Sequence, residues 1–272
     1  GPAGVYSSDI FLRQLKKLGE ELGLGTKARI DLFEKLPVPF GLVRYGVAPD
    51  HPSIKFIASA LEKTLDNPNI HLYCDVEFGK DVTLDDLLAR YDAVLFATGA
   101  VKDKPLNLPG ADLEGVYGAA KFVEWYDGYP TGAREWPLSA ENVAVIGGGN
   151  VAMDAVRTAR RLGAEATIVY RRSEKELPAR AEEVHHAREE GIRFRMLTNP
   201  VEVLADERGW VRGLRCVEME LGEPDESGRR SPVVKPGSEF DLPCDVVVMA
   251  LGTSPNPLIA STTEGLRTDR RG

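Results

Sequence analysis

Blocks of apolar and polar residues along the chain give the first indication of its fold. Residues 143–146 form a short apolar run, typical of a buried parallel strand. Small and apolar residues then recur with helical spacing over 151–162, and Gly163 follows where a helix usually ends. Three arginines fall mostly off that apolar face: Arg157, Arg160 and Arg161. With a second apolar run at 166–170, the pattern predicts a complete strand, helix and second strand.

The same reading predicts further elements on both sides of this unit. In the first half we expect a helix through residues 11–18 that ends at glycines 23–25, a strand at 28–33, a helix at 54–65, a strand at 71–74 and a buried strand at 91–100. A polar, proline-bearing linker with an aromatic cluster then leads to residue 143. In the second half we expect strands at 192–197, 201–204, 211–221 and 244–252, with a solvated loop at 222–230.

Residues 37–52 hold too many prolines and glycines for a regular helix or a central strand. We expect a shaped loop there. Long loops with apolar and aromatic residues are often binding elements, and a lid that only packs is the alternative.

The sequence between the two central strands matches the glycine pattern GxGxxA at Gly147, Gly149 and Ala152. The first glycine permits a tight turn, the second lets the backbone approach a pyrophosphate, and the small third residue lets the helix pack closely against the strand. Phosphates bound there would lie at the helix N-terminus, where free N–H groups and the helix dipole favour an anion.

Two arginines, Arg171 and Arg172, follow the second strand, where an NAD-specific fold usually has an acid for the ribose 2′-hydroxyl. Paired arginines suit a 2′-phosphate, so this pattern favours NADPH. The alternative is that the glycines serve packing and that the arginines are a solvated basic pair.

The N-terminus, Gly1-Pro2-Ala3-Gly4 followed by a helical pattern, resembles the second half of another glycine turn. We expect the preceding strand and first glycine to belong to sequence upstream of Gly1. Glu34 stands at the end of the following strand, where an acid that binds ribose belongs. An exposed acid in a loop is the alternative for Glu34.

Composition and length limit the remaining functions. A chain of 272 residues predicts two lobes, and the net charge of −8 argues against a general nucleic-acid binder. No apolar run approaches the roughly 20 residues of a membrane helix. Three separated cysteines without CxxC spacing suggest neither disulfides nor a metal site, and adjacent helical histidines, His185 and His186, point different ways. We expect no metal and a cytoplasmic location.

Longer motifs carry a family resemblance. The N-terminal GPAG, VPFGLVRYGVAPDHP at 38–52 and FVEWYDGYP at 122–130 resemble ferredoxin NADP reductases of the adrenodoxin reductase type. The segments GGGNVAMDA, YRRSEKELPARAEEV and LGTSPNPLI resemble the small chain of NADPH-dependent glutamate synthase. Both belong to one superfamily of flavoproteins with two dinucleotides.

This resemblance implies an α/β fold with two Rossmann-like lobes. An interrupted FAD domain would host an inserted NADPH domain that carries a small antiparallel β meander. The implied boundaries are residues 1–100 for a partial FAD domain, 101–252 for the NADPH domain, and 253–272 for the start of the return. The resemblance also implies cofactor positions. For FAD they are Gly1, Ala3, Gly4, Glu34 and the loop from Leu42 to Val47; for NADPH they add Asn150, Val151 and Glu183 to the glycine turn and the arginine pair. Apart from the resemblance, Gly99 is a candidate because it ends the 91–100 strand at the edge where open α/β sheets bind ligands.

The function implied is a flavoprotein reductase that passes hydride from NADPH to FAD and electrons to a redox protein such as ferredoxin. Hydride transfer between two cofactors needs stacking and exclusion of water, so no catalytic acid or base is assigned. One alternative is the NADPH-oxidising small chain of glutamate synthase, with its large subunit as partner. Another is a non-catalytic module that binds NADPH.

Overall fold

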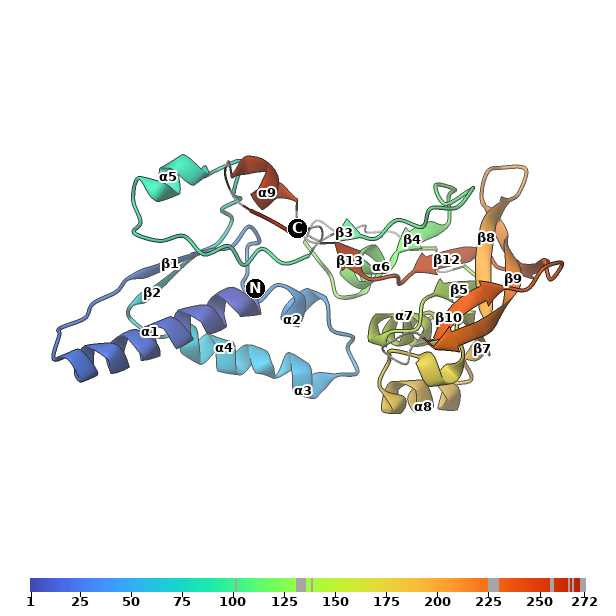
Figure 1. The fold of residues 1–272 in the computed structure, drawn as a ribbon, viewed down its shortest axis with the longest axis horizontal. Coiled ribbons are helices and arrows are strands. Elements are labelled where there is room, and N and C mark those ends of the chain that lie inside the picture. Colours follow the sequence, from blue (N-terminus) through green and yellow to red (C-terminus); the bar gives the residue numbers. More distant parts are fainter. Residues whose placement is uncertain are drawn as a thin grey trace. The chain divides into compact units, whose positions relative to one another are not determined.

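The computed structural model describes residues 1–100, 102–130, 136–137, 139–224, 230–254, 257–263, 265 and 267–269. The chain forms two compact units (Figure 1). Unit 1 comprises Gly1–Lys102, Asp127–Thr131 and Ser254–Gly272, and unit 2 comprises Asp103–Tyr126 and Gly132–Thr253. Two short strands that pair with each other, β3 (Lys102–Asp103) and β13 (Thr253–Ser254), lie where the chain passes between the units.

Unit 1 is built on a long helix, α1 (Pro2–Leu22), which ends at Gly23 because that residue adopts the left-handed conformation with φ 66°. Strand β1 (Ile30–Phe33) pairs in parallel with β2 (Ile70–Tyr73). Helix α4 (Ile57–Leu65) lies between these strands in sequence, and its Leu61 is buried with Val5 and Phe40. The remaining helices of unit 1 are α2 (Leu42–Tyr45), α3 (Pro52–Lys55), α5 (Leu84–Leu88) and α9 (Leu258–Thr262).

Three expectations for unit 1 are corrected. The predicted buried strand at 91–100 is wrong: these residues form no strand, and the Leu95 side chain is 71% exposed. A strand needs neighbours for its backbone groups, and the sheet in the described part of unit 1 contains β1 and β2 alone. The loop at 37–52 includes one helical turn, α2, and the helix expected at 54–65 is interrupted at Phe56.

Unit 2 contains a parallel five-stranded sheet in the order β4-β12-β5-β6-β7. Its strands are β4 (Val116–Gly118), β12 (Val246–Met249), β5 (Asn142–Ile146), β6 (Glu165–Val169) and β7 (Arg193–Arg195). Side chains alternate between two covered faces, which explains why the central strands are continuously apolar. Val143 and Val145 point to one face of β5, whereas Ala144 and Ile146 point to the other.

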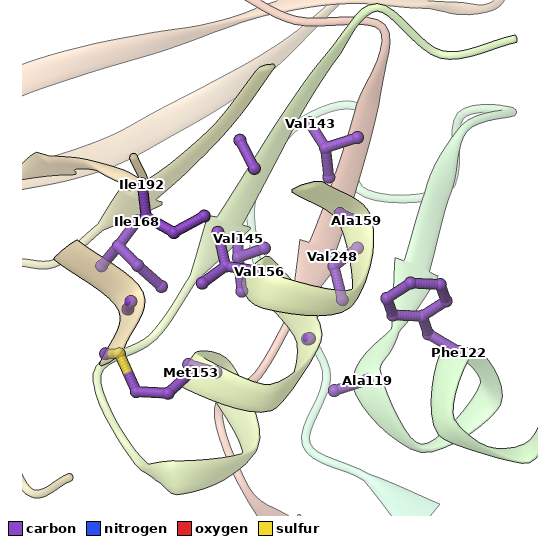
Figure 2. Close-up of a cluster of buried hydrophobic side chains, with 14 of the residues drawn as sticks. Ala119, Phe122, Val143, Val145, Met153, Val156, Ala159, Ile168, Ile192 and Val248 are labelled. Carbon is purple, nitrogen blue, oxygen red and sulfur yellow. The ribbon is translucent and has the colours of Figure 1, made fainter. Parts of the chain in front are cut away.

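Helices cover the first of these faces. They are α6 (Ala119–Tyr126), α7 (Asn150–Arg161) and α8 (Ala181–Glu189). Figure 2 shows Met153, Val156 and Ala159 of α7 in the cluster that also contains Val145 of β5. The face of α7 differs from the prediction at its edges, because Val151 and Leu162 are exposed and Arg157 is buried.

An antiparallel sheet covers the second face. It contains β8 (Thr198–Ala205), β9 (Val211–Pro224), β10 (Arg230–Val234) and β11 (Phe240–Pro243), with β9 pairing to each of the others. Leu214 and Cys216 of β9 are buried with Val247 of β12, so the two sheets share one apolar layer. The loop expected at 222–230 is shorter at both ends, since β9 continues to Pro224 and β10 begins at Arg230; residues 225–229 lie outside the described part.

Candidate dinucleotide-binding sites

The glycine turn of unit 2 leads directly from β5 into α7. Gly147 has φ 146°, and a Cβ added to it would lie 2.4 Å from the carbonyl oxygen of Ala250, so only glycine fits. Gly149 is the N-cap of α7, and a Cβ there would have no atom within 4 Å. Ala152 is fully buried under the turn. The three positions therefore provide a tight turn, an open surface and close helix packing, as a bound pyrophosphate requires.

Asn150 and Val151 form the exposed first turn of α7, next to Gly149. The Asn150 side chain is already engaged, because its Oδ1 accepts a hydrogen bond of 2.9 Å from the backbone N–H of Arg180. It thereby ties the start of α7 to the segment before α8. The first-turn N–H groups of a helix are available to an anion at this position.

The arginine pair lies at the carboxyl end of β6, and its two members differ in burial. Arg171 is exposed, whereas Arg172 is 8% exposed and its Nε has no hydrogen-bond partner among the described residues. The Arg172 carbonyl accepts a hydrogen bond of 3.0 Å from Leu197 N–H. Leaving a buried guanidinium nitrogen unpaired is unfavourable, and an anionic ligand group would compensate for it.

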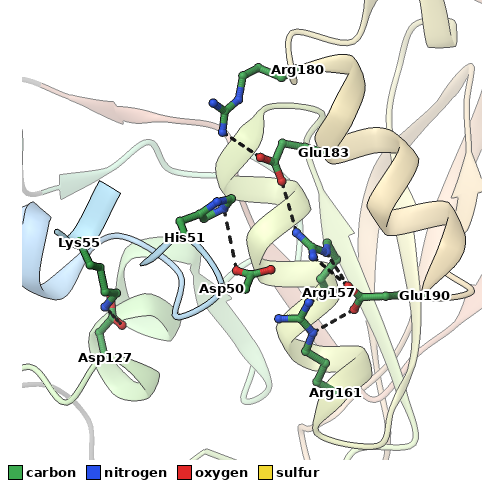
Figure 3. A network of polar contacts seen from close by, with 9 residues as sticks. All are labelled: Asp50, His51, Lys55, Asp127, Arg157, Arg161, Arg180, Glu183 and Glu190. Atoms are coloured by element: carbon green, nitrogen blue, oxygen red, sulfur yellow. Dashed lines mark hydrogen bonds and ion pairs between the residues drawn. The ribbon is translucent and has the colours of Figure 1, made fainter. Parts of the chain in front are cut away.

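Glu183 lies inside an ion-pair network rather than on an open surface. Its carboxylate is 3% exposed and accepts from Arg157 at 3.3 Å and from Arg180 at 2.8 Å. Figure 3 shows Arg157 of α7 between Glu183 and Glu190, and Glu190 also pairs with Arg161 at 2.6 Å. These arginine bonds lower the pKa of Glu190 against the opposing effect of burial, which is the largest single influence. The network joins α7 to α8, a role that the sequence pattern did not reveal.

In unit 1, two of the expected FAD positions lie together. The amino group of Gly1 is 3.0 Å from Oε2 of Glu34, whose Oε1 accepts from Leu36 N–H. A Cβ added to Gly41, the residue before α2, would lie 3.2 Å from Gly1 Cα. The start of α1, the end of β1 and the loop that begins α2 are therefore neighbours.

The other expected positions of unit 1 differ in their surroundings. Gly4 is buried, and an added Cβ would meet Leu32 at 3.1 Å, which shows close packing of helix on strand. Leu42 is largely exposed in α2, and Val47 is half-buried. Ala3 and Gly99 are exposed, and Gly99 has φ 70°.

The adjacent histidines and the two buried cysteines have surroundings that do not point to a role in these sites. His185 is exposed and pairs with Glu189 at 3.2 Å. Cys216 and Cys244 are buried free thiols, and burial raises the pKa of each to about 12. Neither thiol is poised as a nucleophile, because the thiolate is the reactive form.

Comparison with known proteins decides the family. The family described as pyridine nucleotide-disulphide oxidoreductase matches residues 43–272. The chain belongs to this family. It is 36% identical over 278 residues to the glutamate synthase [NADPH] small chain of Halomonas elongata, covering 100% of this chain and 56% of that protein.

Two further relatives are an adrenodoxin oxidoreductase and FprA. NADPH:adrenodoxin oxidoreductase of Drosophila melanogaster is 42% identical over 158 residues, 58% of this chain and 32% of that protein. A structure of FprA from Mycobacterium tuberculosis in complex with NADPH superimposes with a TM-score of 0.85 at 28% identity, covering 99% of this chain and 71% of that one.

These matches confirm the family resemblance and the α/β fold with two dinucleotide-binding lobes. The chain spans between about a third and just over half of the length of the curated relatives that it matches. None of the described helices is long and apolar enough to cross a membrane.

Proposed function

We propose that the protein is a flavoprotein reductase that binds NADPH in unit 2 and FAD in unit 1. The observation that carries the proposal is a glycine turn with open space at Gly149, followed at the end of the neighbouring strand by Arg171 and by Arg172, whose Nε has no hydrogen-bond partner among the described residues. These two features match the two charged parts of NADPH, its pyrophosphate and its 2′-phosphate. The NADPH complex of FprA, which has the same fold, supports this assignment.

The residues of unit 1 fit FAD in a similar way. Gly1, Ala3 and Gly4 would follow the pyrophosphate at the start of α1, and Glu34 would accept from ribose hydroxyls. Leu42 and Val47 would line the flavin, with Gly99 beside it. The close contact of Gly4 with Leu32 gives the tight helix-strand packing that such a site needs.

When bound, NADPH supplies a hydride and FAD accepts it. The contribution of this chain is to bind and orient the two nucleotides and to keep water from them, and no side chain is assigned as a general acid or base. Arg171 and Arg172 hold the 2′-phosphate end, while the N–H groups at the start of α7 hold the pyrophosphate. Glu183 contributes indirectly, because its ion pairs fix the positions of Arg157 and Arg180.

For the electron acceptor we propose a ferredoxin-like carrier. The segments at 38–52 and 122–130, which resemble ferredoxin reductases, support it, as does the adrenodoxin oxidoreductase match. The second candidate is the large subunit of glutamate synthase, favoured by the match of the whole chain to small chains of that enzyme. A soluble reductase of this kind would act in the cytoplasm.

Titration of the purified protein with NADPH and NADH tests the nucleotide assignment. Replacing both Arg171 and Arg172 with Gln should weaken NADPH by roughly 2 to 4 kcal/mol and leave NADH nearly unchanged, because hydrogen bonds to charged groups contribute about 1.5 to 3 kcal/mol each. Arg208→Gln, an exposed change in the turn between β8 and β9, is the matched control. Equal losses of affinity for NADPH and NADH would contradict the proposal. They would favour the alternative in which the glycines serve packing and the arginines are a solvated basic pair.

The acceptor is tested separately with FAD-loaded protein. NADPH is supplied with ferredoxin and a haem reporter, or with the glutamate synthase large subunit, glutamine and 2-oxoglutarate. Reporter reduction that depends on ferredoxin supports the first candidate. Glutamate formation without ferredoxin supports the second candidate. If neither the reduced reporter nor glutamate forms, the result supports a module that binds NADPH without catalysis.

A further inference from the structure

The segment between β6 and α8 lies against the middle of the glycine turn. We call residues 173–180 the strap. Its backbone bonds directly to the turn, since Ala179 N–H donates to the Gly148 carbonyl at 3.0 Å and Arg180 N–H donates to Asn150 Oδ1 at 2.9 Å. The strap is thus attached on both sides of Gly149, the position with open space above it.

The strap has its own internal support. It begins with a 3-10 turn, η1 (Glu174–Glu176), in which Ser173 and Glu176 form a reciprocal capping box. The hydroxyl of Tyr170 donates to the Glu176 carbonyl at 2.7 Å. Because Tyr170 directly precedes Arg171, this bond connects the strap to the strand end that carries the arginine pair.

Side chains from the strap and from Tyr170 also close the space over Gly148. A Cβ added to Gly148 would lie 2.7 Å from Leu177 Cδ2 and 2.8 Å from the Tyr170 ring. Real Cβ atoms do not approach other atoms so closely, and the Tyr170 hydroxyl bond holds the ring in place. Gly148 is the unspecified second position of GxGxxA, so the nucleotide fingerprint does not require glycine there.

We infer that the strap is a positioning element for the NADPH pyrophosphate and that Gly148, Leu177 and Tyr170 are its positioning residues. The peptide between Gly148 and Gly149 is trans, so its N–H points away from its C=O. With the C=O held by Ala179, the Gly149 N–H is directed to the side opposite the strap. The inference rests on the proposed function and adds to it the residues that set the orientation of this donor.

The test compares two ligands in each variant. NADPH uses both the pyrophosphate and the 2′-phosphate contacts, whereas 2′-AMP lacks the pyrophosphate. Gly148→Ala should weaken NADPH roughly tenfold to a hundredfold, the range for losing hydrogen bonds to a charged group. Binding of 2′-AMP should stay within about twofold. Adding Leu177→Ala to Gly148→Ala removes the nearest clashing atom and should restore part of the NADPH affinity.

Two further variants keep the test decisive. Tyr170→Phe retains the ring but removes its bond to Glu176, and should weaken NADPH by about two- to tenfold even if Gly148→Ala fails to fold. Gly25→Ala, with nothing within 4 Å of its added Cβ, is the matched glycine control and should change neither ligand.

The outcomes separate the inference from the proposed function. A parent protein that does not bind NADPH contradicts both. If the parent binds NADPH and the folded Gly148→Ala and Tyr170→Phe variants bind it equally well, the proposed function stands and the inference that the strap positions the pyrophosphate is wrong. Parallel losses of NADPH and 2′-AMP in these variants would show a general structural defect and would also overturn it.

Discussion

Arg157 and Glu183 form an ion pair of 3.3 Å between α7 and α8, and both side chains are buried. Removal of one partner from a buried pair costs about 3 to 5 kcal/mol where the other charge is left uncompensated. Without Arg157, Glu183 still has its contact with Arg180 and Glu190 still has its contact with Arg161. We therefore expect Arg157→Met to lower the free energy of unfolding of unit 2, by no more than about 3 to 5 kcal/mol because these two contacts remain. The double variant Arg157→Met with Glu183→Met should be milder, since no charge of this pair remains to be desolvated.

Tryptophan fluorescence in urea measures this effect selectively, because Trp125, Trp136 and Trp210 all belong to unit 2. Lys16→Met is the control, since its contact with Glu20 is exposed, lies in unit 1 and should not change the tryptophan transition. A double variant less stable than Arg157→Met would show that the pair is not the source of the loss.

Because Arg172 is buried and Arg171 is exposed, we expect replacement of Arg172 to raise the stability of the ligand-free protein while it weakens NADPH binding. Arg172→Met should stabilise the ligand-free protein by about 1 to 3 kcal/mol, because a buried nitrogen without a partner is removed. The same change should abolish most of the increase in thermal midpoint caused by NADPH. Arg171→Met should alter ligand-free stability by no more than about 0.5 kcal/mol. Calorimetry with and without NADPH measures both quantities, and destabilisation by Arg172→Met would contradict this reading of its burial.

Gly147 and Gly149 should respond differently to alanine. Gly147→Ala places a Cβ against the Ala250 carbonyl at a backbone angle that disfavours side chains, so unit 2 should lose about 1 to 3 kcal/mol or more of stability. Gly149→Ala meets no protein atom, so its cost in stability should be limited to the poorer N-cap, about 0.5 to 1 kcal/mol. It should nevertheless weaken NADPH by about 1 to 3 kcal/mol, because the methyl group occupies the approach of the pyrophosphate. Unfolding curves and NADPH titration of the two variants give the comparison.

Buried thiols predict a loss of stability in alkali. Burial raises the pKa of Cys216 and Cys244 from 9.0 to about 12, so both thiols stay protonated in the folded state while the unfolded chain ionises above pH 9. The stabilisation is complete below pH 9 and is lost as the pH rises toward 12. Each thiol should contribute a slope of about 1.4 kcal/mol per pH unit within that window.

Unfolding of unit 2 between pH 8 and pH 10.5 measures this slope. The variant Cys216→Ala with Cys244→Ala should have a shallower slope, whereas Cys74→Ala in unit 1 should match the parent. Tyr117, whose pKa is also raised by burial, contributes to the slope in every variant. Equal slopes in parent and double variant would contradict the role of the thiols.

The central strand, helix and strand of unit 2 were predictable from sequence because each is fixed by local pattern. Apolar runs gave β5 and β6, and glycines at both ends bounded α7. The glycine turn was found for the same reason. The need for glycine at Gly148, the middle position of the turn, could not be predicted in this way. It comes from Tyr170 and Leu177, which are not part of the glycine fingerprint.

Features that depend on distant partners were missed. Arg157 lies on the buried side of α7 because Glu183 and Glu190 of the α8 region neutralise it, and helical spacing cannot reveal such partners. The apolar run at 91–100 predicted a strand, yet strand formation also requires a neighbouring strand to pair with. Local composition carries no information on whether that neighbour is present.

The order of strands in unit 2 has a consequence for its synthesis. Strand β12 lies between β4 and β5, although β5 ends at Ile146 and β12 begins only at Val246. The β5 edge therefore has no β12 partner while the intervening residues are synthesised. At roughly 5 to 20 residues per second, this synthesis takes several seconds or longer. During that interval Val143 and Val145 lack the β12 side of their core. A ribosome stalled before residue 246 would hold a chain with an open, apolar strand edge, a form that chaperones and proteases recognise.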